Sequence, residues 1–149
     1  MVRLLIVTSL LFACQQQSLP SKVEIVVEKQ VEKVDSTLSL SNLYNYLKKG
    51  SHPKETLTQI CGETNYLNSS LVKTHNNLGG FQTSKGYIKF KTWQQSADFF
   101  MNWQKDHKLT DSVDYWKWLE NTNYHQVKKQ GYTLFMKGVM KELERRGVL

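Results

Sequence analysis

Apolar residues between Ser41 and Arg146 recur at three- and four-residue spacing, and turn signals separate each stripe from the next. Only the run 87–91 is rich in strand-forming residues, and it follows Phe81 and Gln82 across a turn at 84–86. No strand–helix–strand alternation and no internal repeat is present. The sequence therefore predicts a mainly α domain with one short β-hairpin.

Helices are expected at 41–49, from Pro53 onwards, and at 69–75, 93–105, 113–119 and 132–146. Thr110 or Asp111 is the expected cap of the helix at 113–119. In the helix that opens at Pro53, the expected buried stripe is Leu57, Ile60, Cys61 and Thr64. In the last helix, the side chains expected to point inward are those of Phe135, Val139, Met140 and Leu143.

The first residues have the character of an export signal. Arg3 precedes a ten-residue apolar run that is too short to span a bilayer, and Cys14 follows it directly. Residues 11–14 resemble a bacterial lipobox, in which the cysteine becomes the lipidated first residue. Ordinary secretion and a simple hydrophobic N-terminus are the alternatives. We therefore expect a signal peptide over 1–14, a charged tether over 15–37 and the working domain over 38–149.

The domain carries the whole positive charge of the chain. The net charge is +7, and residues 38–149 hold 16 basic and nine acidic side chains. A basic domain favours an anionic partner such as nucleic acid, a membrane or an acidic cell-wall polymer. Charge alone does not choose among these three.

Several kinds of chemistry have no signature in the sequence. There is no Gly-rich phosphate loop, no CxxC and no HExxH, and the four histidines lie far apart. Two cysteines are too few for a thiolate metal site or a disulfide scaffold. We expect neither a metal site nor a cofactor.

One acidic residue lies in an unusual setting. Glu63 is the only acid between Glu55 and Asp98, Gln59 precedes it by one helical turn, and Gly62 beside it suggests close packing or ligand approach. A carboxyl group among apolar neighbours can stay protonated near neutral pH and serve as a general acid in glycoside cleavage. A solvent-facing glutamate on an amphipathic helix is the alternative.

Three ordered motifs support the first interpretation: residues 52–66, then 69–71, then 76–80. With further similarity at 86–90, 93–96, 103–104, 118–119 and 123–124, they resemble the glucosaminidase domain of glycoside hydrolase family 73, to which flagellar peptidoglycan hydrolases and many autolysins belong. The resemblance covers about residues 40–146. It implies a compact, lysozyme-like helical domain of the kind seen in Bacteroidota and their phages.

The resemblance also implies roles for individual residues. Glu63 would donate its proton to the glycosidic oxygen, and the hydroxyl of Tyr124 would face the reacting sugar. Asn76 and Asn77 would shape the floor of the cleft, although a helix-ending turn explains them equally well. The remaining substrate-binding candidates are Gln59 and three aromatic residues that could stack on sugars or simply belong to the core, Tyr66, Tyr87 and Trp93.

The chain departs from the family pattern at Asn65, at residues 79–81 and at Phe90. Residues 79–92 contain no acid, whereas longer family members carry a second carboxylate in the hairpin. Three later aspartates, Asp98, Asp111 and Asp114, have no evident route to the site. Either the acetamido oxygen of the substrate acts as nucleophile, or the domain binds glycan without cleaving it.

The sequence thus predicts a peptidoglycan hydrolase cleaving at N-acetylglucosamine, an endo-β-N-acetylglucosaminidase. The alternatives are a lytic transglycosylase and an inactive wall-binding module. The expected partners of the protein are glycan strands and, through a lipid on Cys14, a membrane of the bacterial envelope. Without the lipid, the protein would be secreted. Nucleic acid is not expected, because no binding motif is present. The oligomeric state is left open.

Overall fold

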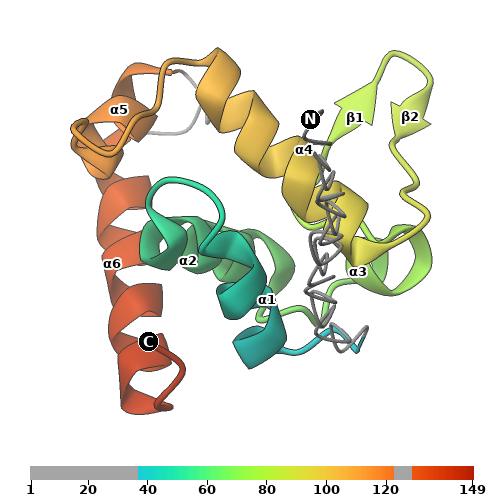
Figure 1. The fold of residues 1–149 in the computed structure, drawn as a ribbon, viewed down its shortest axis with the longest axis horizontal. Coiled ribbons are helices and arrows are strands. Elements are labelled where there is room, and N and C mark those ends of the chain that lie inside the picture. Colours follow the sequence, from blue (N-terminus) through green and yellow to red (C-terminus); the bar gives the residue numbers. More distant parts are fainter. Residues whose placement is uncertain (1–36, 123–128) are drawn as a thin grey trace, which may run out of the picture. The chain divides into compact units, whose positions relative to one another are not determined.

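The computed structural model describes residues 37–122 and 129–149. Its elements, in chain order, are α1 (Leu40–Leu47), α2 (Pro53–Thr64), α3 (Ser70–His75), β1 (Gln82–Thr83), β2 (Gly86–Tyr87), α4 (Trp93–Asp106), α5 (Tyr115–Asn121) and α6 (Lys129–Arg145) (Figure 1). This confirms the predicted mainly α fold with one short hairpin. The predicted signal peptide, Cys14 and Tyr124 lie outside the described residues. Within them, no helix is long and apolar enough to cross a membrane.

Side-chain caps fix the start of four helices. Ser39, Ser69, Thr92 and Asp114 each accept a hydrogen bond from a backbone N–H in the first turn of the helix that follows. The predicted cap of α5 was wrong, because the helix begins at Tyr115 under Asp114 rather than under Thr110 or Asp111. The helix α2 begins with Pro53, as expected, since proline loses no hydrogen bond in a first turn.

The hairpin is shorter than the sequence predicted. β1 and β2 are antiparallel and pair Gln82 with Tyr87 and Thr83 with Gly86. The strand does not continue to residue 91, because that segment bonds elsewhere: Phe90 donates its N–H to the carbonyl of His75, 2.9 Å away, at the end of α3. The segment after β2 is therefore fastened to α3.

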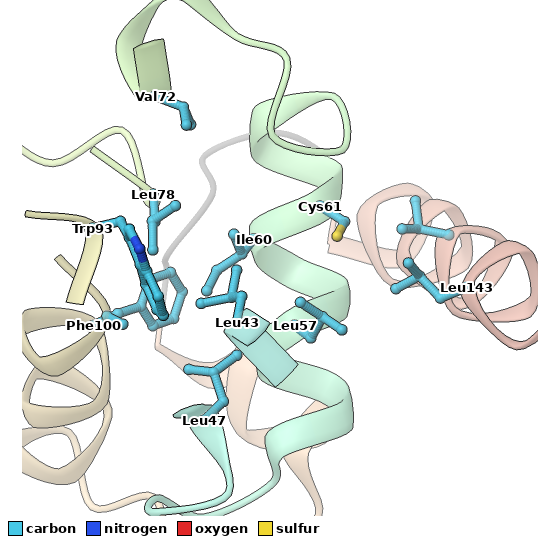
Figure 2. Close-up of a cluster of buried hydrophobic side chains, with 12 residues drawn as sticks. Leu43, Leu47, Leu57, Ile60, Cys61, Val72, Leu78, Trp93, Phe100 and Leu143 are labelled. Carbon is cyan, nitrogen blue, oxygen red and sulfur yellow. The ribbon is translucent and has the colours of Figure 1, made fainter. Parts of the chain in front are cut away.

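A first core cluster joins α1, α2 and α4 to the C-terminal half of α6. Its buried members are Leu43, Leu47, Leu57, Ile60, Cys61, Val72, Leu78, Trp93, Ala97, Phe100, Val139 and Leu143 (Figure 2). The predicted stripe of α2 is confirmed, since all four of its residues are buried. Burial raises the pKa of the Cys61 thiol to about 12, so Cys61 is a core side chain.

A second, smaller cluster lies around α5. Its buried members are Leu109, Tyr115, Trp118 and Leu119, and its partly buried members are Trp103, Val113, Trp116 and Tyr132. The indole of Trp118 donates a hydrogen bond to the carbonyl oxygen of His107, 2.8 Å away. This second cluster is mostly aromatic, and α6 enters it through Tyr132.

The buried face of α6 differs from the predicted one by part of a turn. Val139 and Leu143 are buried as expected, but Phe135 is 55% exposed and Met136 is fully buried in its place. Met136 is the residue that meets α2 at Gly62. The contact with α2 therefore decides which face of α6 points inward, and the apolar spacing alone could not choose between adjacent residues.

Candidate functional site

Glu63 lies in the last turn of α2 and is half-buried. The hydroxyl of Tyr132, in the N-terminal part of α6, donates a hydrogen bond to Oε1 of Glu63 over 2.5 Å. Tyr132 itself packs against the second cluster. The Glu63 carboxyl is thus held between α2 and α6 by a contact across 69 residues of sequence, and it does not project freely into water.

Gly62 brings α2 and α6 close together beside this pair. A Cβ atom added at Gly62 would lie 2.6 Å from the terminal methyl carbon of Met136 and 3.3 Å from the ring of Phe135. Close packing was one of the two interpretations of this glycine, and the structure confirms it. The exposed ring of Phe135 consequently lies next to the turn that carries Glu63.

Gln59 was predicted to bind substrate and to support Glu63, and both expectations were wrong. Its side chain is fully buried, and its Oε1 accepts a hydrogen bond from the hydroxyl of Tyr115 over 2.5 Å. That hydroxyl accepts in turn from Nε2 of Gln104, which also reaches Thr56. Within the described residues, Nε2 of Gln59 has no partner. Gln59 therefore belongs to a buried polar network linking α2, α4 and α5.

Asn77 holds the hairpin and cannot also line a cleft. It is fully buried, its amide group donates to the carbonyls of Phe81 and Ile88, and its oxygen accepts from the N–H groups of Gly79 and Phe81. Asn76 ends α3 with a φ of 50° and donates to the carbonyl of Phe90. The backbone of Asn76 thus ends α3, while both side chains hold the hairpin and the segment that follows it.

The three aromatic candidates have different surroundings. Trp93 is only 4% exposed and packs edge-on against Tyr46, so its prediction as a sugar platform was wrong. Tyr66 is half-buried, and the guanidinium of Arg146 covers its ring at 4.3 Å. Only Tyr87, on β2, presents a large exposed ring, at 53%. The structure therefore leaves Tyr87 as the aromatic candidate open to a ligand.

None of the three aspartates considered as a second carboxylate is brought to Glu63. Asp98, on α4, accepts a hydrogen bond from the hydroxyl of Tyr46 over 3.0 Å, and Asp114 caps α5. Asp111 lines an open groove of about 780 Å³ with Lys48, Lys49 and Lys105. That groove is at the N-terminal end of α2, so Glu63, at the other end, is not among its lining residues.

Sequence reasoning missed Tyr132, because a contact across 69 residues leaves no trace in local spacing. In the part of the chain that is described, no group of three or more His, Cys, Asp or Glu side chains could hold a metal ion. Comparison with protein-family models, with curated proteins and with solved structures finds no match to this chain.

Proposed function

We propose that this chain is a peptidoglycan hydrolase that cleaves glycan strands at N-acetylglucosamine, with Glu63 as general acid. The observation that carries the proposal is the hydrogen bond from Tyr132 to Oε1 of Glu63. With Oε1 accepting from Tyr132, the Glu63 carboxyl is held in a defined position at the end of α2. A general acid needs this fixed orientation toward the glycosidic oxygen.

Two further features support this proposal. The exposed rings of Phe135, beside the turn of Glu63, and of Tyr87, on the hairpin, are the kind of surface on which sugars stack. The net charge of +7 suits a polymer that bears carboxylates on its peptide stems. The proposed location, the bacterial envelope with a lipid on Cys14, depends on the sequence pattern of residues 1–14.

The direct test is digestion of purified peptidoglycan by the wild-type protein and by Glu63→Gln, with fragments identified by mass spectrometry. We expect the wild type to release new reducing ends at N-acetylglucosamine and the variant to lose about 10²- to 10⁴-fold in rate, the usual contribution of a general acid. Glu144→Gln is the matched control, because Glu144 is an exposed residue of α6. It should cleave like the wild type.

The same digests separate the alternatives. Fragments that end in 1,6-anhydro sugars would show that the protein is a lytic transglycosylase and not a hydrolase. If the wild-type protein sediments with peptidoglycan and releases no fragments, the domain is a wall-binding module. Equal rates for the wild type and Glu63→Gln would remove Glu63 from the proposal.

Tyr132→Phe tests the orientation of the acid. The substitution deletes only the hydroxyl that contacts Glu63, so we expect kcat to fall by about 10- to 100-fold, with KM nearly unchanged, because the acid loses its alignment. Tyr44→Phe removes a hydroxyl from α1, which has no part in the proposal, and serves as control. Unchanged kcat in Tyr132→Phe would show that the hydroxyl has no part in the reaction.

A further inference from the structure

The first turns of α6 hold a second carboxyl group besides Glu63. Thr133, the residue after Tyr132, donates a hydrogen bond from its hydroxyl to Oε1 of Glu120 over 3.0 Å. Glu120 lies near the end of α5 and, like Glu63, is half-buried. Two consecutive residues of one helix thus hold two carboxyl groups that come from two other helices.

The other described acids are hydrogen-bonded elsewhere, distant from Glu63 along α2, or exposed. Asp98 pairs with Tyr46, Asp114 caps α5, and Glu142 pairs with Arg145. Glu55 is in the first turn of α2, eight residues from Glu63 and therefore about 12 Å along the helix. Asp106, Asp111 and Glu144 are exposed, as Asp98 and Asp114 are too. Among the described acids, only Glu63 and Glu120 accept hydrogen bonds from the first turns of α6.

The surroundings of Glu120 are unusual for an acid in a chain of net charge +7. Among the described residues, Glu120 is hydrogen-bonded by the neutral hydroxyl of Thr133. Thr133 is only 7% exposed, so the position of its hydroxyl is fixed by packing. Within the described part of the chain, Glu120 is therefore positioned by a neutral donor.

We infer that Glu120 is the second carboxylate of the site and acts as general base. The inference depends on the proposed function, for which an inverting mechanism requires two carboxyls on opposite sides of the scissile bond, about 6.5–9.5 Å apart. A wide separation of this kind suits carboxyls that come from different helices. The sequence had offered no residue for this role.

The step balances with these two groups and water. The water oxygen forms a bond to the anomeric carbon while the bond from that carbon to the leaving oxygen breaks. Glu120 takes the proton of the attacking water, and Glu63 gives its proton to the leaving oxygen. The configuration at the anomeric carbon is inverted, and both carboxyls return to their starting states by proton exchange with solvent.

The experiment measures peptidoglycan cleavage by Glu120→Gln and Glu120→Ala, using Glu144→Gln as control. We expect Glu120→Gln to lose about 10²- to 10⁴-fold in kcat, as removal of a general base does. Azide should restore part of the activity of Glu120→Ala, because azide attacks the anomeric carbon without losing a proton. A restored rate also shows that the variant is folded.

The products decide between mechanisms. Proton NMR of fresh digests should show the α-anomer, and the azide product should be an α-glycosyl azide. A β-anomer formed at similar rates by wild type and Glu120→Gln would overturn the inference in favour of the substrate's acetamido group, while the hydrolase proposal would stand. A wild type without hydrolytic activity would overturn both.

Thr133→Val separates positioning from chemistry. Valine keeps the shape of threonine but cannot donate to Glu120, so we expect kcat to fall by about 10-fold while KM is unchanged. The azide-supported rate of Glu120→Ala should not change when Thr133→Val is added, because the carboxylate is already absent. A further drop in that double variant would mean that Thr133 acts by supporting the fold alone.

Discussion

The two hydrophobic clusters of this domain are built in different ways. The first is almost wholly apolar, and helical stripes of α1, α2 and α4 supply most of it. The second is mostly aromatic and adjoins the polar chain of Gln59, Tyr115 and Gln104. Both proposed carboxyls are held by α6 where it reaches this second cluster. The first cluster thus supplies stability, and the second positions polar groups.

The largest loss of stability should follow from truncating a large side chain in the first cluster. Phe100 is fully buried and packs edge-on against Phe81 with ring centres 5.4 Å apart. Phe100→Ala should lower the free energy of unfolding by about 3–5 kcal/mol, since it leaves a cavity. Urea denaturation followed by circular dichroism measures this. The neighbouring Phe99 is 41% exposed, so Phe99→Ala should cost much less; equal losses would contradict the assignment of the core.

In the second cluster, stability should depend on the hydroxyl of Tyr115. Tyr115→Phe removes the link between Gln59 and Gln104 and takes from the buried Oε1 of Gln59 its donor, so we expect a loss of about 1–3 kcal/mol in unfolding free energy. Tyr87→Phe, on an exposed ring, should have almost no effect in the same urea titration. If the two variants were equally stable, the polar network would not contribute to the fold.

Removing one helix cap in each region gives a further comparison of the two clusters. Thr92→Ala uncaps α4, which supplies the first cluster, and Asp114→Ala uncaps α5, which supplies the second. Each should cost about 1 kcal/mol, and Asp114→Ala should cost more because its carboxylate also interacts favourably with the helix dipole. Thermal melts of both variants test the order. Asp114→Asn should recover most of the loss, and its failure to do so would rule out capping as the cause.

The smallest expected effect is at the far end of α6. Hydrogen bonds from Arg145 and Arg146 lower the pKa of Glu142 to about 2. Because this pKa lies below the ordinary value of 4.5, the stabilisation is present above pH 4.5 and is lost as the pH falls toward 2. The Tm difference between wild type and Glu142→Gln should shrink over that range. A difference that stays constant from pH 6 to pH 2 would contradict this.

The sequence predicted the first cluster far better than the second. The stripe of α2 and the start of α2 at Pro53 follow from local spacing and from the tolerance of proline in a first turn. Phe135 was misplaced because adjacent apolar residues on α6 compete for the same face, and the contact at Gly62 decides between them.

The site was only partly predictable for a related reason. Glu63 could be singled out because acids are scarce around it in the sequence. Tyr132 and Glu120 could not, since each acts through a contact between distant helices. Asn77 had the residue type of a binding group, but its four hydrogen bonds to backbone groups are visible only when the hairpin is folded.

The contact between Gly62 and Met136 has a consequence for how this domain can diverge. Position 62 has no room for a side chain unless the methionine withdraws, because an added Cβ would come within 2.6 Å of its tip. In homologous chains, we therefore expect these two positions to covary, with alanine or serine at 62 accompanied by a shorter residue at 136. A larger residue at position 62 alone would crowd Met136 and disturb the spacing of α2 and α6 that brings the Tyr132 hydroxyl to the Glu63 carboxyl.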